Sequence, residues 1–411
     1  MPIPARRGAH FALGLSGLVC LSHAPGAYAL DQDKVLLRAN ASVNYDSNVF
    51  RFSDQIAVPP SLGGPGKSDI YYGLGAGARL HLPVSRQVFS ADVSATQYSY
   101  STFDVLNYTG YNGRATWDWR AGNDWYGQLT AGARQARQAI STEVGFFVPR
   151  LYKTYDQLAT LRYGLTPRWE LQGGFSAYQT RYSDPVARGG DFDAQTWDLG
   201  AKYTSPVGNS TGLRLRYEHG EWINLLPGSN PTFGTSYDQY TASAVVDWYV
   251  TGHSRLYGDV GYTERQRQQA SEGDFSGLSG RLNYDLTLSG KLLLHTSLYQ
   301  IRGPFDSAIA NYTRQTGVDL TGTYDATGKT SVQGLLTYLV LDFLGTALPG
   351  ALPPNGEQRQ DKLTYYGINV AHRPTRTVTL SAGVGEQTRT SNVPFGDFKA
   401  TMAYLSAQIE F

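Results

Sequence analysis

The chain has 411 residues, a net charge of +1 and only 17% charged residues, and it contains 46 glycines and 29 tyrosines. Near-neutral charge argues against a nucleic-acid partner bound by phosphate neutralisation. Cys20 is the single cysteine of the sequence, which excludes disulfides and thiolate metal sites within the chain.

The first 29 residues have the order of a secretory signal peptide. Two arginines precede an apolar run from Phe11 to Leu21, and Ala27–Ala29 fits a small-residue cleavage site. The run is shorter than the ~20 apolar residues that a membrane anchor needs. We therefore expect residues 1–29 to be a signal peptide and residues 30–411 to form one exported domain.

Beyond this segment, apolar and polar residues alternate with a period of two from end to end. In Lys34–Asp46 and in Ile70–Leu82 every second residue is apolar, and the residues between are mostly polar or glycine. Such a strand presents one face to an apolar medium and the other to water. The glycines of Ile70–Leu82 are expected to let the wall bend, or to let a neighbouring side chain approach the backbone closely.

Two kinds of break separate the alternating runs, and the kinds take turns along the chain. Short turns such as Arg120–Asp124 carry Gly, Pro, Asn and Asp. The expected long loops include Ser47–Ser68, Ser141–Thr154, Arg181–Phe192 and Gly345–Asp361. We count eight short turns and nine loops between eighteen strands. An even strand number, with short turns on one side and long loops on the other, is typical of a transmembrane barrel.

A soluble β-sandwich also shows alternation, but further features favour the barrel. The strands run to about ten or more residues rather than the usual five or six, and no linker divides the chain. Outward aromatic residues gather near both strand ends, as in the girdles of membrane barrels. They are Trp119, Trp125, Trp169 and Trp248 beside short turns, and Tyr45, Tyr72, Trp197, Tyr217 and Tyr240 toward the long loops.

The predicted fold is therefore all-β: a transmembrane antiparallel outer-membrane β-barrel of about 18 strands. Short turns are expected on the periplasmic side and long loops on the extracellular side. The expected location is the outer membrane of a Gram-negative bacterium.

The charged and polar residues lie on the strand faces opposite the apolar ones, and their positive and negative charges nearly balance. Assigning alternate residues strand by strand gives these inward candidates for a transport path: Arg79, Arg114, Arg134, Arg162, Arg214, Arg216, Arg265, Asp92, Asp118, Asp259, Tyr126 and Tyr178. Taken singly, the ions are expected to brace one another across a wide, wet bore. Taken together, they fit a transport path in which tyrosines offer flat surfaces to sugar rings.

No constellation of residues points to catalysis. The five histidines beyond residue 29 fall on separate strands or turns, and no pair has metal-ligand spacing. His295 and Ser297 share an inward face, as in some serine hydrolases. Polar residues two apart are, however, what every lumen-facing strand contains. We expect no enzyme activity, no cofactor and no metal.

The last strand carries a signal of its own. Alternate residues from Thr401 to Phe411 lie on one face and are mostly apolar. This strand must close the barrel against the first, because an open edge in lipid leaves unpaired backbone groups that cost several kcal/mol each. A terminal Phe after alternating apolar residues resembles the recognition signal of the barrel assembly machinery, so Phe411 is predicted to be an assembly signal.

The segment NYDSNVFRFSD, Asn44–Asp54, resembles an N-terminal motif of β-barrel porins of exopolysaccharide gene clusters. It is most similar to the EpsL-type outer-membrane protein of exosortase systems, and the matching residues are Tyr45, Asp46, Asn48, Phe50 and Arg51. The resemblance implies export of a polysaccharide across the outer membrane. The resemblance thus adds the polysaccharide and periplasmic polysaccharide-export components to the partners expected from the fold, which are outer-membrane lipid and the barrel assembly machinery. No nucleic acid is expected, and there are no catalytic residues to carry over.

Two functions follow from this pattern. The first is an exit pore for an exopolysaccharide, and the alternative is a general or sugar-selective uptake porin, which the same wall would serve. Uptake porins usually narrow the bore with an infolded loop, and Ser47–Ser68 or Gly345–Asp361 would be that loop or a lid. The direction of transport stays open at this point.

Overall fold

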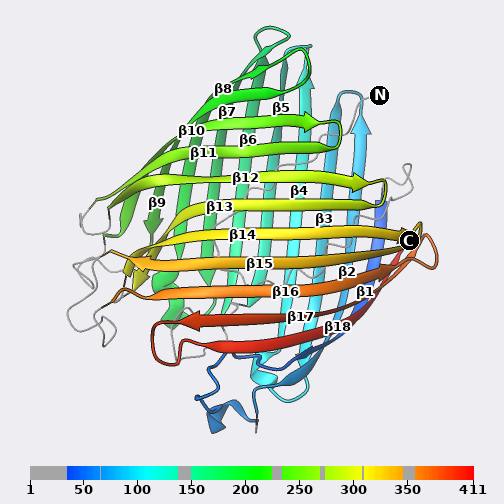
Figure 1. The fold of residues 1–411 in the computed structure, drawn as a ribbon, viewed down its shortest axis with the longest axis vertical. Coiled ribbons are helices and arrows are strands. Elements are labelled where there is room, and N and C mark those ends of the chain that lie inside the picture. Colours follow the sequence, from blue (N-terminus) through cyan, green and yellow to red (C-terminus); the bar gives the residue numbers. More distant parts are fainter. Residues whose placement is uncertain are drawn as a thin grey trace.

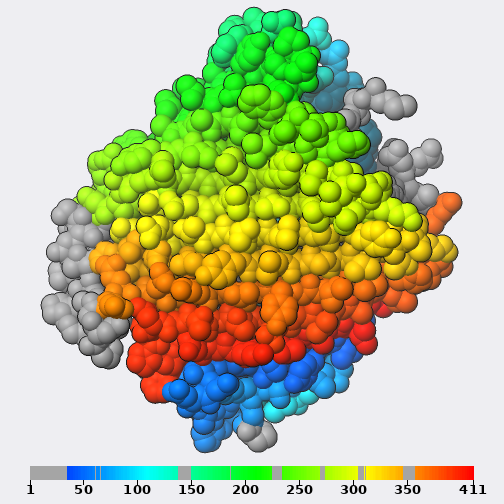
Figure 2. Space-filling view, in the orientation of Figure 1, coloured from blue at the N-terminus to red at the C-terminus, as the bar shows by residue number. Residues whose placement is uncertain are grey.

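Eighteen antiparallel strands form one closed sheet in the computed structural model, which describes residues 35–64, 66–137, 150–224, 234–268, 274–307, 310–345 and 357–411. Each strand pairs with its neighbours in sequence, and β1 pairs with β18, so the sheet has no edge. The expected signal peptide lies outside the described residues. In Figure 1, β2 to β8 run upright behind β12 to β18, and Figure 2 shows the continuous outer surface of the front wall.

The strands are β1 (Val35–Asp46), β2 (Asp69–Val84), β3 (Gln87–Tyr100), β4 (Tyr108–Ala121), β5 (Trp125–Arg137), β6 (Leu151–Gly164), β7 (Trp169–Tyr182), β8 (Phe192–Thr204), β9 (Ser210–Trp222), β10 (Ser236–Thr251), β11 (Ser254–Arg267), β12 (Phe275–Ser289), β13 (Leu292–Ser307), β14 (Ala310–Thr327), β15 (Thr330–Leu344), β16 (Gln360–His372), β17 (Val378–Ser391) and β18 (Phe398–Glu410). Short 3-10 segments are η1 (Pro60–Leu62), η2 (Asp104–Leu106) and η3 (Pro185–Gly190). Among the described residues, no helix is long and apolar enough to cross a membrane.

The outer face of the sheet is an apolar belt. Val43 pairs with Leu405 on one side and with Tyr72 on the other, so the three side chains point the same way. On this face Leu74 and Leu213 are each 71% exposed. Apolar area left in water costs about 25 cal/mol per Å², so a belt of this kind is stable against lipid chains. The predicted membrane-facing parity is confirmed.

Aromatic rings gather at both ends of the belt, as predicted. At the short-turn end, the rings of Phe89 and Trp117 stack with centroids 5.6 Å apart. At the long-loop end, the Tyr217 ring lies 5.5 Å from that of Trp197 and 5.2 Å from that of Tyr240. These are the two interface girdles of a membrane barrel. Because such barrels have short periplasmic turns and longer extracellular loops, the long-loop end is the extracellular one.

The barrel closes through the last residue of the sequence. The backbone N–H of Leu37 donates to the carbonyl oxygen of Phe411 at 2.7 Å, and the N–H of Phe411 donates back to Leu37 at 2.9 Å. The Phe411 ring lies on the outer face and is 66% exposed. The seam between β1 and β18 is therefore paired to its end.

Several strands extend further than alternation alone predicts. Leu151–Thr154 was expected in a loop, but Leu151 pairs with Arg137 and the segment belongs to β6. Likewise β7 includes Arg181, which pairs with Lys153. Backbone pairing continues beyond the hydrocarbon layer of the membrane, where both faces of a strand meet polar surroundings and alternation ends. These extensions place charged residues on the strands above the belt.

The glycines of β2 lie at positions where side chains of the inner face pack closely against the strand backbone. A Cβ at Gly75 would lie 2.5 Å from Thr96 Oγ1, and one at Gly77 would lie 2.7 Å from Arg38 Nε. Contacts under 3.0 Å force a neighbour to move. Close approach of lumen side chains, as predicted, is the reason for glycine here.

Candidate functional site

Ion pairs that skip a strand identify the inner face of the barrel, because only side chains on the concave side reach over a middle strand. Arg38 on β1 pairs with Asp92 on β3, and Arg114 on β4 pairs with Asp156 on β6. The strand register then places all predicted transport candidates on the inner face: Arg79, Arg114, Arg134, Arg162, Arg214, Arg216, Arg265, Asp92, Asp118, Asp259, Tyr126 and Tyr178.

On β1–β3 two arginines share one carboxylate. Arg38 donates from Nη2 to Asp92 Oδ1 at 2.5 Å and from Nη1 to Oδ2 at 3.0 Å. Arg79 Nε donates to the same Oδ2 at 3.2 Å. This section of wall keeps a positive excess, and the Arg79 side chain is 42% exposed.

The wall of β4–β6 has a larger positive excess. Asp156 pairs with Arg114 at 2.9 Å. Within the described residues, no carboxylate lies within ion-pair distance of Arg134 or Arg162. The Arg162 guanidinium lies 5.9 Å from the ring centre of Tyr126, whose hydroxyl donates to Glu170.

Charges on β8–β11 balance one another. Arg216 Nε donates to Asp198 Oδ1 at 2.8 Å, and Arg214 Nη2 lies 2.9 Å from Asp259 Oδ2. A longer contact of 3.9 Å joins Arg214 to Asp198. These three predicted transport candidates and their partner Asp198 form one network, which is the bracing expected from the sequence.

Arg265 is a bracing residue of the extracellular mouth rather than part of the open wall. Its side chain is 1% exposed, lies 3.7 Å from the Tyr237 ring centre and 4.9 Å from that of Phe275. Its Nε and Nη2 donate to Gln239 Oε1 at 2.9 and 2.6 Å. The inward direction was predicted, but the cover by two aromatic rings was not.

The hydrolase interpretation of β13 gains no geometric support. His295 Nδ1 lies 2.6 Å from Asp285 Oδ1, while the Ser297 hydroxyl donates to the side-chain oxygen of Asn283. Both pairs are cross-strand contacts of the inner wall. Among the described residues, no group of three His, Cys, Asp or Glu side chains could hold a metal ion.

The inner face of β15 and β16 is apolar at the mouth, which sequence analysis missed. Leu341 and Phe343 are buried there with Ala310, and Leu363 packs against them. The signal was present in Leu335–Leu344, where apolar residues follow one another without alternation. That pattern marks a strand whose two faces are both covered.

The charged sections of the inner wall face each other across the barrel. Below the extracellular ends, the inward ions of β1–β6 are Arg38, Arg79, Arg114, Arg120, Arg134, Arg162, Asp92, Asp118 and Asp156. Those of β12–β14 are Arg281, Asp285, Asp319 and Asp325. In a ring of eighteen strands, β4 and β13 are opposite. A wall with excess positive charge therefore faces one with excess negative charge.

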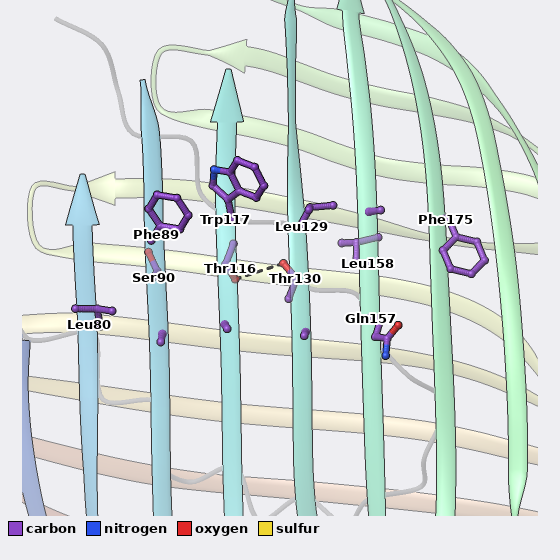
Figure 3. A pocket seen from close by; sticks show the side chains of 14 residues that line it. Leu80, Phe89, Ser90, Thr116, Trp117, Leu129, Thr130, Gln157, Leu158 and Phe175 are labelled. Carbon is purple, nitrogen blue, oxygen red and sulfur yellow. Dashed lines mark hydrogen bonds between the residues drawn. The ribbon is translucent and has the colours of Figure 1, made fainter. Parts of the chain in front are cut away.

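A hollow of about 520 Å³ lies over β2–β7, but it is not on the inner face. The large side chains around it, Leu80, Phe89, Trp117, Leu129 and Phe175, have outward parity (Figure 3). An apolar hollow on this face accommodates lipid chains rather than polar solutes.

The motif at Asn44–Asp54 forms a rim structure, here called the seam clasp: Asp46, Asn48 and Arg51. Arg51 Nη1 donates to Asp46 Oδ1 at 2.8 Å and to Oδ2 at 2.7 Å, and its Nε donates to Gln387 at 3.1 Å. Asn48 Nδ2 donates to the carbonyl oxygen of Lys399 at 3.1 Å. The clasp thus ties the start of the first loop to β17 and β18.

The rest of the first loop packs at the mouth. Phe50 is buried against Phe103, with ring centres 4.7 Å apart, and both belong to a cluster with Tyr100 and Leu106. The loop therefore lies over the extracellular end of β2 and β3, near their inner face. Most of the other candidate lid, Gly345–Asp361, lies outside the described residues.

No known protein family and no curated protein matches this sequence. Among solved structures, the chain is similar to OccAB4 of Acinetobacter baumannii, with a TM-score of 0.50 and 10% identity over 93% of this chain and 99% of that chain. The chain has the fold of an outer-membrane porin. OccAB3 of A. baumannii gives a TM-score of 0.47 at 11% identity, covering 92% of this chain and 99% of that one.

A BenF-like porin from Pseudomonas fluorescens Pf-5 is similar at 12% identity, with a TM-score of 0.47, over 93% of this chain and 100% of that one. At such identity the likeness concerns the fold. The EpsL-type resemblance gains no support from these comparisons. The closed barrel, its apolar belt and its girdles place this chain in the outer membrane of a Gram-negative bacterium.

Proposed function

We propose that this porin is a passive channel through which small hydrophilic solutes enter the periplasm. The observation that carries the proposal is the pair of opposed walls: excess arginine on β1–β6 faces excess aspartate on β12–β14. Opposite charges across a water-filled bore create a transverse field that orients dipolar solutes and selects against apolar ones. Barrels of sixteen to eighteen strands leave an aqueous channel.

The exposure of the inner ions supports the same function. The side chains of Arg79 and Arg114 are 42% and 51% exposed, in contrast to the covered arginines of the mouth. Charged groups in contact with water are able to exchange hydrogen bonds with a passing solute. Arg134 and Arg162 have no carboxylate partner among the described residues, so they contribute most to the field of their wall.

Export of an exopolysaccharide is the second candidate, supported by the inward tyrosines. The rings of Tyr98 and Tyr108 stack with centroids 4.9 Å apart, and flat aromatic faces suit sugar rings. The motif that suggested export forms the seam clasp, so its residues serve the rim rather than the bore. Polysaccharide and periplasmic export components are partners only under this second proposal.

Conductance of the purified full chain in planar bilayers tests the channel. We expect stable conductance steps, and we expect R134Q/R162Q to lower the anion-to-cation permeability ratio by about twofold or more, because two uncompensated cations leave the wall. The ratio is measured from the reversal potential in a salt gradient. The control is Lys362→Gln, on the outer face of β16, which should leave the ratio unchanged. A parent protein that forms no conducting pore would overturn the proposal.

Deletion of the gene in its own bacterium separates the two candidates. Under the uptake proposal, growth on a limiting small solute slows and secreted polysaccharide stays constant. Loss of secreted polysaccharide, with polymer accumulating in the periplasm and growth unchanged, would favour export instead.

A further inference from the structure

Two clusters with the same set of charges, two cations and one aspartate, lie on the outer face, at the extracellular end of the barrel. Cluster one is Lys153 on β6, Arg181 on β7 and Asp193 on β8. Cluster two is Arg302 on β13, Arg314 on β14 and Asp342 on β15. In each, two cations on adjacent strands are followed by an aspartate on the third strand, and the second cluster repeats the first seven strands further round.

The two cations of each cluster stand directly opposite each other. Lys153 pairs in register with Arg181, and Arg302 pairs with Arg314. Like charges directly opposite on neighbouring strands destabilise a sheet. In both clusters, a nearby anion would relieve this repulsion.

The aspartate of each cluster neutralises one cation and leaves the other without a carboxylate partner among the described residues. Arg181 pairs with Asp193, and Arg314 Nη2 lies 2.9 Å from Asp342 Oδ2. Within the described part of the chain, no carboxylate lies within ion-pair distance of Lys153 or Arg302. Each cluster therefore keeps a positive excess.

The clusters lie close to the aromatic girdle at the extracellular end. Tyr155, two residues from Lys153, is on the outer face among the girdle aromatics. Near cluster two, Tyr338 has outward parity and lies on the same strand as Asp342. The clusters thus stand just beyond the girdle, at the level of lipid head groups, and on the side of the long loops. In a Gram-negative outer membrane that leaflet carries phosphorylated lipopolysaccharide.

We propose that each cluster binds a phosphate group of lipopolysaccharide. Guanidinium groups bind phosphate through paired hydrogen bonds, and the facing cation adds a second charge. Gln360 Nε2 donates a hydrogen bond to Asp342 Oδ1 at 2.7 Å. This bond holds in place the carboxylate that pairs with Arg314. The lipid binds from the membrane side, so this role is independent of what passes through the bore.

Native mass spectrometry of the folded full chain with lipopolysaccharide tests the proposal. We expect two tightly held lipid molecules on the parent, one on K153Q/R181Q and one on R302Q/R314Q, with affinity at the altered cluster about fivefold lower for each cation removed. The control Lys362→Gln removes an outward cation that faces Thr390 and Val340, and it should retain both lipids.

Lipopolysaccharide treated with phosphatase should bind weakly to the parent, whereas free inorganic phosphate should compete poorly with the intact lipid. If the variant that combines all four substitutions, K153Q/R181Q/R302Q/R314Q, still holds two lipids, or if the dephosphorylated lipid binds equally well, the proposal is wrong. Heat-modifiable migration confirms that each variant is folded. For any variant that is not folded, the phosphatase comparison on the parent decides the same question.

Discussion

Asp46 and Asp92 both pair with arginine on the inner side of the barrel, yet their surroundings differ. The side chains of Asp46 and Arg51 are 10% and 6% exposed, whereas Asp92 is 29% exposed and shares two arginines. Removing one partner of a buried pair leaves an uncompensated charge, while an exposed pair is screened by water. The two sites should therefore respond differently to the loss of a charge.

Asp46→Asn is expected to lower the free energy of unfolding by about 3 kcal/mol, because Arg51 stays buried without a counter-charge. Arg79→Gln, which leaves Asp92 paired with Arg38, should cost less than about 1 kcal/mol at its exposed site. Urea titration of the barrel in lipid vesicles measures both. Equal midpoints for the two variants would contradict the structural importance of the seam clasp.

For single residues, the sequence predicts well whether a side chain points inward or outward, but it predicts poorly how deeply that side chain is buried. The inward parity of Arg265 follows from alternation, because lipid on one side forces every second residue of β11 outward. Its burial depends on Tyr237 and Phe275, which come from two other strands and are joined to it only by the register. The clasp is equally hidden, since Gln387 and Lys399 lie more than three hundred residues from their partners.

Pairs of strands show why glycine and tryptophan occur together at the periplasmic end. Gly127 on β5 has outward parity, and the Trp119 indole from β4 lies over it. A Cβ at Gly127 would clash with the carbonyl oxygen of Thr160 and would lie 2.7 Å from Trp119 Cζ2. The girdle tryptophan thus lies in the space that the missing side chain leaves.

Gly127→Ala should lower the free energy of unfolding by about 1–3 kcal/mol, as overpacking does. Gly334→Ala is the matched control, because Gly334 is also an outward strand glycine and nothing lies within 4 Å of its Cβ position. That control should be neutral or stabilising by up to about 1 kcal/mol. The same vesicle titration compares them, and a harmless Gly127→Ala would refute the packing explanation.

Element by element, the eighteen strands were predictable because a lipid-facing strand must alternate. The sequence was less informative where a strand meets neither lipid nor open water. At Leu341 and Phe343 the inner face of β15 is buried at the extracellular mouth, so both faces of the strand are apolar. Alternation therefore does not show which face points inward. The extended ends of β6 and β7 were missed for the opposite reason, since both faces there are polar.

For the molecule as a whole, the pairing of β1 with β18 at the seam is what closes the sheet into a barrel. Phe411 joins β1 through two backbone hydrogen bonds with Leu37, and its ring lies on the lipid side. The backbone pairing does not need the ring, so the predicted role of Phe411 as an assembly signal is separable from its role in closure.

Phe411→Ala should reduce the amount of heat-modifiable barrel in the outer membrane of cells, because the assembly machinery loses its recognition residue. The same variant should refold into detergent micelles as well as the parent does. Ile409→Ala, which also removes outward apolar area from β18, controls for the loss of lipid contact. If Phe411→Ala lowers the amount of folded barrel equally in cells and in detergent micelles, the effect belongs to stability rather than to recognition by the assembly machinery.

The seam clasp also imposes an order in time. Its hydrogen bonds join Asn48 and Arg51 to residues separated from them by 351 and 336 positions, so they form only after the last strands have arrived. Contacts of such separation are the slowest to form, because the chain between them must first be organised. The first loop, although it is among the earliest parts to be synthesised, is therefore among the last to become ordered. Protease resistance at this loop would mark the moment at which the ring is complete.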